Sequence, residues 1–566
     1  MSPSHVRSGF VRMDTIVTLI EESCRRFRDR TAFLQKRGGS WREIFYETLS
    51  ATSGRIAAGL MENGCQPGEH ASLLATSSPQ WVMAYLGILK TGGVVVPIDK
   101  ELKAVEIRHI LDHSEARTLF VDGDHLDMVL DMANGLPLLR LIVTPDGPNE
   151  GPKRQSGASR CTILTLGELL KDGIFPPVSL QPHDTALILY TSGTTGRSKG
   201  AMLSHANIVS NIRGAAVHLG VDQSVHTLSF LPINHVFEQV CGILLPLSLG
   251  GKISFCESLK KLGENLAEVK PTFFVGVPAV FRMILARIMK RIDEETVSRL
   301  LYANPFTRPL VISRVRSKLG TGTVFISGGA ALDPTIAVGF AKLGVTLLQG
   351  YGITETSPVI AAEAPDRARP GTVGRVLAGI EVRIDTPDLD MVGEILVRGP
   401  NVMQGYFKDP DATAEAIVGG WYRTGDLGRF DGDGFLTICG RVKSLIVTPN
   451  GKNIYPEEVE NELLKSPFIS EVIVYGNKLA PATEEIHAII YPNQEAFDDY
   501  GRREGKVTLA HADMEQVLRA EVRAACSGLA IYKRVRKFTI REEEFPKTTT
   551  RKIKRFEVTE EAAKRQ

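Results

Sequence analysis

The most informative feature of this chain is the stretch Tyr190-Thr191-Ser192-Gly193-Thr194-Thr195-Gly196-Arg197-Ser198-Lys199-Gly200. It follows the apolar run 185–189, which predicts a buried strand. Glycines let a backbone approach a ligand closely, hydroxyls donate hydrogen bonds to phosphate oxygens, and Lys199 adds a positive charge. The stretch therefore predicts a polyphosphate-binding loop. It is not a Walker A loop, because no Gly-Lys-Ser/Thr follows four variable residues. The alternative is a flexible turn.

Length and composition are those of a globular protein of several domains. The chain has 566 residues, 43% hydrophobic and 23% charged residues and a formal net charge of +2. Because nucleic-acid binding needs a basic face, this charge balance gives no reason to expect a nucleic-acid partner.

The cysteines and the apolar segments indicate a cytoplasmic protein. The 7 cysteines are scattered without a CxxC pair, so neither a disulfide framework nor a zinc site is expected. Residues 1–17 lack the pattern of a signal peptide. The apolar run 240–249 is far shorter than the roughly 20 residues of a membrane span. The sequence leaves peripheral membrane contact open.

Alternating periodicities predict an α/β fold with largely parallel sheets. Helices are expected at 14–34, 41–60 and 79–90, and strands at 71–75, 92–98, 118–121 and 139–144. A polar surface loop is expected at 145–160, a second α/β block at 187–349 and a β-rich subdomain at 371–399, with strands at 381–384 and 394–397. A small α+β domain follows residue 440, with helices at 456–465 and 511–526 and strands at 471–475 and 486–490. The predicted domains are therefore 1–440 and 441–566.

Further motifs follow the loop in a fixed order. They are Ser327-Gly328-Gly329-Ala330-Ala331-Leu332, Gln349-Gly350-Tyr351-Gly352-Ile353-Thr354-Glu355, Trp421-Tyr422-Arg423-Thr424-Gly425-Asp426, Gly440-Arg441-Val442-Lys443 and the ending Phe545-Pro546-Lys547-Thr548-Thr549-Thr550-Arg551-Lys552-Ile553-Lys554-Arg555. In this order the chain resembles the adenylate-forming superfamily of acyl-CoA synthetases, luciferases and carrier-protein adenylation domains. The resemblance covers nearly the whole chain. It implies a large adenylating region of α/β subdomains with a β-rich subdomain, and a small mobile C-terminal domain.

The resemblance implies a set of ligand-binding residues. The ATP- and AMP-binding residues would be Thr191, Ser192, Gly193, Thr194, Thr195, Lys199, Gly328, Gly329, Ala330, Gly350, Tyr351, Gly352, Thr354, Asp426, Arg441 and Lys552. Thr191 and Glu355 would hold Mg²⁺, which prefers carboxylate and phosphate oxygens together. Tyr351 would stack on adenine, Thr354 would touch phosphate and Asp426 would accept both ribose hydroxyls. The alternatives are a solvated loop acid for Glu355, an ordinary turn for Asp426 and a surface cation for Arg441.

The ending implies a catalytic lysine at Lys552, because a carboxylate that attacks an anionic phosphate needs a positioned cation. A solvated basic tail or a nucleic-acid patch is the alternative. Lys443 is the expected hinge. Arg551 stands where the family usually has Gly, and Ser444 stands where an acid is common. Neither departure removes a catalytic group.

The segment Leu231-Pro232-Ile233-Asn234-His235-Val236-Phe237-Glu238 resembles one found in long-chain acyl-CoA synthetases, in which the histidine lies beside the acyl carboxylate. A buried histidine bonded to a backbone carbonyl is the alternative for His235. Phe273 and Phe274 are expected in an apolar wall near the acid, although ordinary core packing explains part of this strand.

The resemblance implies an AMP-forming acyl-CoA synthetase, most like bacterial long-chain fatty acid–CoA ligases. Such an enzyme uses ATP and Mg²⁺ to convert a carboxylic acid to acyl-AMP, releasing pyrophosphate. Coenzyme A then displaces AMP. The alternatives are an aryl- or short-chain ligase, an enzyme that stops at acyl-AMP or loads a carrier protein, and a catalytically silent nucleotide-binding protein.

Overall fold

The computed structural model describes residues 14–145, 161–172, 178–191, 198–320, 322–447, 452–480, 483–505, 509–547 and 553–564. The chain forms two compact units. Unit 1 comprises Met1–Glu381 and Val397–Tyr422, and unit 2 comprises Val382–Leu396 and Arg423–Gln566. The predicted loop at 145–160 lies, except for residue 145 itself, outside the described residues. The domain boundary predicted at residue 440 stays a prediction.

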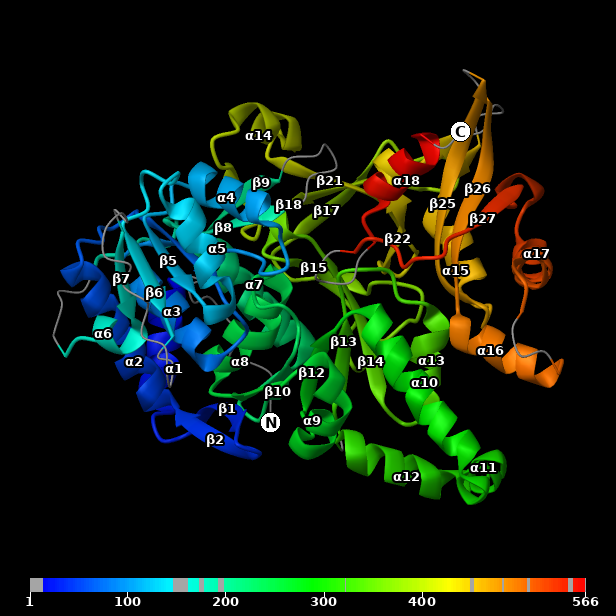
Figure 1. Ribbon diagram of the computed structural model, residues 1–566, viewed down its shortest axis with the longest axis horizontal. Helices are drawn as coiled ribbons and strands as arrows, with labels where there is room; N and C mark the ends of the chain where they lie inside the picture. The colour runs from blue at the N-terminus through cyan, green and yellow to red at the C-terminus, as the bar shows by residue number, and fades with distance from the viewer. Residues whose placement is uncertain are drawn as a thin grey trace. The chain divides into compact units, whose positions relative to one another are not determined.

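Unit 1 contains an eight-stranded sheet (Figure 1). In sheet order its strands are β19 (Gly405–Tyr406), β9 (Lys199–Ser204), β8 (Thr185–Thr191), β4 (Val94–Pro97), β3 (His70–Leu74), β5 (Thr118–Val121), β6 (Leu141–Thr144) and β7 (Thr162–Thr165). The six strands from β8 to β7 are parallel, and β9 and β19 are antiparallel to their neighbours. All four residues of β4 are buried, as expected for a parallel strand covered on both faces.

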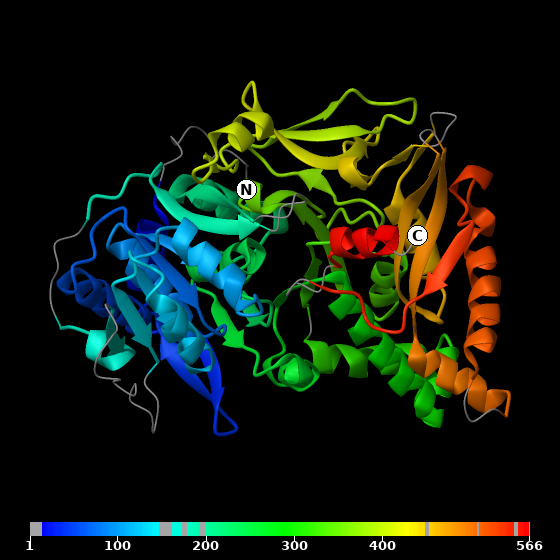
Figure 2. The same ribbon diagram turned by 45° about the horizontal axis from the view of Figure 1, so that its top comes forward.

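Helices cover both faces of this sheet (Figures 1 and 2). Val94 and Val96 pack with α4 (Ala104–His113) and α5 (Gly123–Ala133) in one hydrophobic cluster. Val95, which points to the opposite face, joins the cluster of α1 (Ile16–Arg26), α2 (Tyr46–Glu62) and α3 (Pro79–Lys90). The doubly covered sheet confirms the predicted α/β class.

Helix α3 shows how local sequence sets an element. Ser78 is the N-cap, and its hydroxyl accepts a hydrogen bond from the Trp81 amide at 3.2 Å. Pro79 occupies the first helical position, where a missing N–H costs nothing. The bounds Pro79–Lys90 confirm the helix predicted at 79–90.

A second sheet of nine strands completes the framework of unit 1. In order its strands are β16 (Arg375–Val376), β15 (Val359–Ala362), β14 (Thr346–Gly352), β13 (Val324–Ser327), β12 (Phe273–Gly276), β10 (His226–Ser229), β11 (Lys252–Phe255), β1 (Thr31–Arg37) and β2 (Ser40–Phe45). The six strands from β14 to β1 are parallel. Because β13 and β14 are parallel neighbours, the predicted motifs at their ends, 327–332 and 349–355, lie at the same edge of this sheet.

Two predicted helices were wrong at one end. The helix predicted at 14–34 ends at Arg26, and the helix predicted at 41–60 begins only at Tyr46. Between them lie strands β1 and β2, because β1 pairs with β11 more than two hundred residues later, with Phe33 opposite Ile253. No local sequence pattern around β1 indicates that it pairs with a strand as distant as β11.

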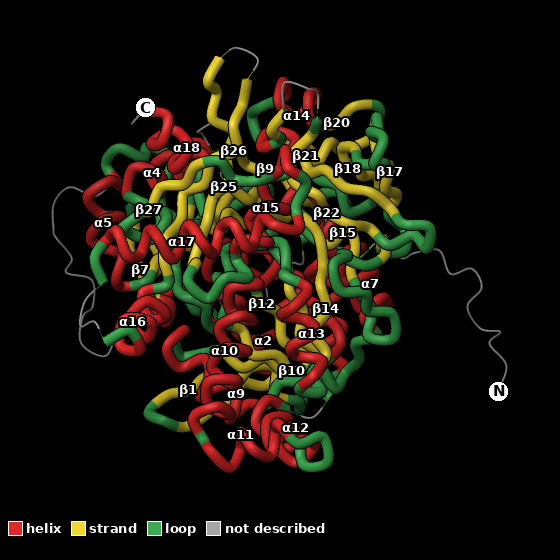
Figure 3. The backbone as a smooth tube through the Cα atoms, turned by 90° about the vertical axis from the view of Figure 1, so that its right-hand side faces the viewer, coloured by secondary structure: helices red, strands yellow, loops and turns green. Residues whose placement is uncertain are grey.

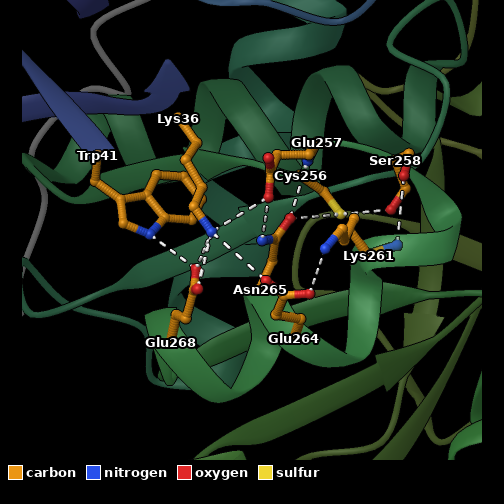
Figure 4. A network of polar contacts seen from close by, with 9 residues as sticks. All are labelled: Lys36, Trp41, Cys256, Glu257, Ser258, Lys261, Glu264, Asn265 and Glu268. Atoms are coloured by element: carbon orange, nitrogen blue, oxygen red, sulfur yellow. Dashed lines mark hydrogen bonds and ion pairs between the residues drawn. The ribbon is translucent and has the colours of Figure 1, made fainter. Parts of the chain in front are cut away.

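Polar contacts tie the hairpin β1–β2 to helix α9 (Leu262–Val269) (Figure 4). The Lys36 ammonium lies 2.8 and 2.9 Å from the two carboxylate oxygens of Glu268 and 3.4 Å from Glu257. The Trp41 indole N–H donates to Glu268 at 3.1 Å. Lys36 thus neutralises a cluster of acids while its side chain is only 8% exposed.

The remaining helices of unit 1 join or flank these strands. They are α6 (Leu166–Leu169), α7 (His205–Leu219), α8 (Leu245–Leu249), α10 (Pro278–Glu294), α11 (Thr296–Ala303), α12 (Arg308–Leu319), α13 (Pro334–Lys342), α14 (Pro410–Ala416), the π-helix η1 (Glu238–Leu244) and the 3₁₀ turns η2 (Leu259–Lys261) and η3 (Thr354–Thr356). None of the helices in the described part of the chain is long and apolar enough to cross a membrane.

A five-stranded sheet confirms the predicted β-rich subdomain. Its strands are β17 (Glu381–Asp385), β18 (Gly393–Arg398), β21 (Trp421–Phe430) and β20 (Ile417–Val418), with β22 (Leu436–Arg441) also paired to β21. The strands predicted at 381–384 and 394–397 are therefore present.

The rest of unit 2 is the predicted α+β region. Its strands are β23 (Ile446–Val447), β24 (Asn453–Ile454), β25 (Ile469–Ala480), β26 (Thr483–Pro492) and β27 (Lys537–Ile540). Its helices are α15 (Pro456–Leu463), α16 (Gln494–Arg503), α17 (His511–Ala525) and α18 (Arg555–Lys564), with the 3₁₀ turns η4 (Val442–Ser444), η5 (Cys526–Gly528) and η6 (Ile531–Lys533). Helix α15 begins with Pro456 and carries two acids in its first turn, which suits the positive end of a helix dipole.

Candidate functional site

The two ends of the glycine-rich stretch face each other in unit 1. Strands β8 and β9 are antiparallel, with Thr191 opposite Lys199, and the Thr191 hydroxyl donates to the Lys199 carbonyl at 3.5 Å. The predicted nucleotide residues between them, Ser192, Gly193, Thr194 and Thr195, lie outside the described residues. The sheet therefore fixes where the predicted phosphate loop begins and ends.

The Lys199 side chain lies over Tyr406, a residue that was not among the predicted site residues. Its ammonium lies 5.2 Å from the centre of the Tyr406 ring and 3.9 Å from an Asp409 carboxylate oxygen. Strand β19 places Tyr406 there, because it pairs with β9 and sets Tyr406 opposite Ala201. Lys199 keeps about a third of its side chain exposed.

Tyr406 connects this cation to the predicted metal ligand. Its hydroxyl donates to a Glu355 carboxylate oxygen at 3.0 Å, and the Glu355 carbonyl accepts the Met403 amide at 2.8 Å. Burial and, after it, the negative charge of Glu355 raise the pKa of Tyr406, so the phenol stays protonated and donates. Tyr406 thus connects the Lys199 cation to the Glu355 carboxylate.

Glu355 and Thr354 lie on the turn η3, directly after strand β14. β14 carries Gly350, Tyr351 and Gly352, and all three are half-buried. At Gly352 a side chain has no room, because a Cβ would lie 2.0 Å from the Pro358 carbonyl oxygen. The glycine therefore allows the close strand pairing that sets the position of Thr354 and Glu355.

The turn after β13 lies against the histidine-containing segment. A Cβ on Gly328 would come within 2.9 Å of the Phe237 ring, so the ring packs directly on this glycine. Gly329 has φ +80°, a conformation that favours glycine, and Ala330 is exposed. The two predicted motifs, adenine turn and acid segment, therefore meet in unit 1.

His235 faces a carboxylate. Its Nε2 lies 3.9 Å from an Asp99 oxygen in the connection that follows β4. Burial lowers the pKa of His235 below its ordinary value, and the negative charge of Asp99 opposes that shift. The imidazole is therefore mainly neutral at neutral pH and able to offer one N–H donor.

Three residues after His235 lies a buried acid, Glu238, at the start of η1. One carboxylate oxygen accepts the Ser229 hydroxyl, and the other has no hydrogen-bond partner among the described residues. Burial raises the pKa of Glu238 to about 8, which the Ser229 hydrogen bond only partly offsets. Glu238 is therefore mostly protonated at neutral pH.

The predicted apolar wall belongs to the hydrophobic core. Phe273 and Phe274 are buried in β12, and the Phe274 ring stacks on Phe230 with a centroid distance of 5.0 Å. Phe281 and Phe325 complete this aromatic group. Contact of Phe273 or Phe274 with an acid stays a prediction.

Two predicted nucleotide residues pair within unit 2. Asp426 on β21 lies opposite Arg441 on β22, and the Arg441 Nε donates to Asp426 at 2.7 Å. The Asp426 amide also bonds the Thr424 hydroxyl at 3.0 Å, which orients the strand locally. Asp426 is buried and Arg441 is half-exposed.

The remaining predicted residues lie farther along the chain. Lys443 is exposed in the short 3₁₀ helix η4. Lys552 and Arg551 lie outside the described residues. On either side of them, Lys547 and Ile553 form an antiparallel bridge, and the Lys554 amide donates to the Pro546 carbonyl at 2.8 Å.

The donor set around Glu355 fits a magnesium ion held together with substrate. Among the described residues, no three His, Cys, Asp or Glu side chains are grouped as a metal cage. Mg²⁺ is commonly held by one or two carboxylates plus substrate phosphates and water, and the carboxylate of Glu355 is a ligand of that kind.

Comparison with known proteins relates this chain to an enzyme family. Residues 20–407 match the family described as AMP-binding enzyme. A long-chain-fatty-acid–CoA ligase of Mycobacterium bovis, FadD15, is 32% identical over 97% of this chain and 96% of its own length.

Solved structures share the fold. ATP-bound MatB from Rhodopseudomonas palustris has a TM-score of 0.76 at 25% identity, over 97% of this chain and 99% of its own. The anthranilate CoA ligase AuaEII, in complex with anthranoyl-AMP, has a TM-score of 0.78 at 22% identity, with 97% of each chain covered. The chain belongs to the AMP-binding enzyme family.

Proposed function

We propose that this protein is an AMP-forming acyl-CoA synthetase, an acid–thiol ligase whose acid is a long-chain fatty acid. The observation that carries the proposal is that the Lys199 cation and the Glu355 carboxylate both contact Tyr406, while Thr191 pairs with Lys199 at the strand ends. In a member of the AMP-binding family, such a cluster of hydroxyl, cation and carboxylate suits a nucleotide triphosphate and Mg²⁺. The similarity to a long-chain ligase over nearly the whole chain supports the choice of acid.

In the first half-reaction a carboxylate oxygen of the acid bonds to the α-phosphorus of ATP, and the bond to pyrophosphate breaks. Mg²⁺, when bound, would neutralise phosphate charge. Glu355 and Thr191 would hold it, and Ser192, Gly193, Thr194, Thr195 and Lys199 would bind phosphate oxygens. Lys552 would add the cation that eases the approach of two anions. The neutral His235 would donate a hydrogen bond to the acid carboxylate.

The nucleoside would be held by the remaining predicted residues. Tyr351 would stack on adenine beside Gly328, Gly329 and Ala330, with Gly350, Gly352 and Thr354 completing the binding surface. Asp426 would accept the ribose hydroxyls, and Arg441 would fix its orientation, as their 2.7 Å hydrogen bond suggests.

In the second half-reaction the coenzyme A thiol attacks the acyl carbon, and AMP leaves. We propose 1–440 as the adenylating domain and 441–566 as the mobile domain, in which the residues beyond Lys443 turn about that residue between the two steps. We also propose a cytoplasmic location with peripheral membrane contact.

The decisive experiment measures products across a panel of acids from acetate to oleate and benzoate. Acid-dependent pyrophosphate release without coenzyme A reports adenylation, and AMP formation that depends on coenzyme A reports the complete reaction. We expect the specificity constant to rise with chain length, because each buried methylene contributes about 0.8 kcal/mol.

Each other result of the panel identifies a different function. Absence of pyrophosphate release with every acid would contradict an enzymatic role. Release that never leads to a coenzyme A thioester would indicate a carrier protein as acceptor. A maximum at benzoate or acetate would move the assignment to an aryl- or short-chain ligase of the same fold.

A mutation separates the two half-reactions. Lys552→Ala should reduce adenylation by roughly a hundredfold or more, while thioester formation from supplied acyl-AMP is much less affected. Lys554→Ala, two residues away, is the matched control. Equal losses of both half-reactions in Lys552→Ala would contradict the role of this lysine.

A further inference from the structure

Helices α11 and α12 of unit 1 expose an unusual combination of side chains. Val297, Leu300, Phe306 and Leu310 are 69%, 64%, 91% and 64% exposed. Isolated exposed apolar side chains are ordinary, but four within fifteen residues mark a surface that contacts something apolar. Figures 1 and 3 show that α11 and α12 lie at the end of unit 1 remote from β8 and β9.

The same segment is strongly basic. Residues 296–319 contain Arg299, Arg308, Arg314, Arg316 and Lys318 and no Asp or Glu, whereas the whole chain has a net charge of only +2. Three exposed acids, Asp293, Glu294 and Glu295, directly precede the segment, and Glu295 lies 3.6 Å from Arg314. All but Arg308 of these cations belong to exposed residues.

The exposed side chains are presented by an ordered frame. Leu301 and Tyr302 pack inward against a small hydrophobic cluster that includes Val311. Val297 and Leu300, three residues apart, therefore share the outer face of α11. In the connection to α12, the Phe306 amide donates to the Asn304 side chain at 2.9 Å, and the Thr307 hydroxyl donates to the Leu301 carbonyl at 2.8 Å.

We propose that residues 296–319, the basic hairpin, form a docking surface for an anionic phospholipid membrane. The apolar side chains would enter the interface between headgroups and acyl chains, while the cations contact lipid phosphates. No described helix is suited to span a bilayer, so the contact is interfacial and reversible. The biological role of this surface, access to fatty acids held in a membrane, rests on the proposed function.

Vesicle sedimentation with the full-length protein tests the proposal without ATP or acid. Vesicles of equal parts phosphatidylglycerol and phosphatidylcholine are compared with vesicles of phosphatidylcholine alone. We expect the protein to bind the anionic vesicles, and high salt to weaken the binding. Absence of binding to the anionic vesicles would overturn the proposal.

Two variants remove the two components separately. Arg299→Glu with Lys318→Glu should weaken vesicle binding at least tenfold, because each cation near an anionic surface contributes roughly fivefold. Phe306→Ser with Leu310→Ser should weaken it by removing the inserted apolar groups. Binding of either double variant equal to that of the wild type would contradict the proposal.

Matched controls lie outside the hairpin. Arg523→Glu with Lys537→Glu changes the same charge on exposed residues, and Leu389→Ser removes an exposed leucine outside the hairpin. Both should bind vesicles like the wild type. If instead the Phe306→Ser, Leu310→Ser variant abolishes a dimer seen by sedimentation equilibrium, the hairpin contacts a second copy of the chain, and the lipid proposal is wrong.

Activity on a water-soluble medium-chain acid, measured without vesicles, should be unchanged in all these variants. This assay separates the two proposals. A protein that binds anionic vesicles but is inactive on every acid would contradict the proposed function alone. A protein that is active but does not bind anionic vesicles would contradict the docking surface alone.

Discussion

The proposed metal site depends on Glu355. One substitution at this residue can remove its charge while keeping its hydrogen bond. In Glu355→Gln, the amide oxygen can still accept the hydrogen bond from the Tyr406 hydroxyl, but the negative charge is lost. We expect acid-dependent pyrophosphate release to fall roughly a hundredfold and to need much more Mg²⁺. The measurement is a magnesium titration at saturating ATP and acid.

Tyr406→Phe is the companion to that variant. It leaves the Glu355 carboxylate intact and removes one hydrogen bond to it, so its loss should be several-fold rather than a hundredfold. Tyr85→Phe serves as control, because the buried Tyr85 hydroxyl has no hydrogen-bond partner among the described residues. An unchanged magnesium requirement in Glu355→Gln would remove Glu355 from the metal site.

Glu238 gives a prediction about stability and pH. Its folded pKa of about 8 lies above the ordinary glutamate value, so the folded state holds a proton that the unfolded state has released. Its stabilising effect is complete below about pH 4.5 and is lost as the pH rises toward 8. The free energy of unfolding of the wild type should therefore fall, relative to that of Glu238→Gln, by up to about 1.4 kcal/mol per pH unit in this window.

Urea unfolding of both proteins from pH 5 to 9 measures that difference. Glu294→Gln, at an exposed position of α10, should follow the wild type at every pH. A difference between wild type and Glu238→Gln that does not change with pH would show that Glu238 titrates normally.

At the scale of elements, local signals determined what the sequence could predict. The helix predicted at 79–90 matches α3, which the local cap at Ser78 and Pro79 starts, and short apolar runs predicted β5 and β8. Strands β1 and β2 were missed because their partner β11 and the helix α9 lie far along the chain. Tyr406 was missed for the same reason, since only the pairing of β19 with β9 brings it to Glu355.

The contact between the β1–β2 hairpin and α9 is testable as a unit. Lys36→Met leaves Glu257 and Glu268 without their shared cation, so the melting temperature should fall. The hydrogen bond to Lys36 lowers the pKa of Glu268, and that stabilisation is present above the ordinary glutamate pKa and lost as the pH falls through the folded value. The difference in melting temperature should therefore be largest near neutral pH and shrink in acid.

Lys261→Met is the matched control within the same network (Figure 4). Lys261 bonds Glu264 at 2.7 Å but is about half exposed, so its removal should change the melting temperature little. Thermal melts of the wild type, Lys36→Met and Lys261→Met at neutral and acidic pH measure these differences in melting temperature. Equal effects of both substitutions would show that the low exposure of Lys36 is unimportant.

At the scale of the whole molecule, the proposed mechanism requires a pivot at Lys443. This residue lies in the 3₁₀ helix η4, whose φ range includes the value that proline fixes. Lys443→Pro should still release pyrophosphate with acid and ATP, and should fail to pass the acyl group to coenzyme A because the backbone can no longer rotate there.

Lys443→Ala keeps the backbone free and should perform both steps. Single-turnover thioester formation from supplied acyl-AMP distinguishes the two variants. Thioester formation by Lys443→Pro at the wild-type rate would place the pivot elsewhere.

The hydrogen bond between Arg441 and Asp426 has a consequence for the order of events. Both residues belong to the β21–β22 ladder, which ends two residues before Lys443. In the proposed mechanism Asp426 and Arg441 hold the ribose, so a pivot at Lys443 would leave both residues in place and move only the residues beyond it. AMP should therefore stay bound while coenzyme A binds. It should dissociate only after the thioester has formed, so that AMP release is the last step of the catalytic cycle.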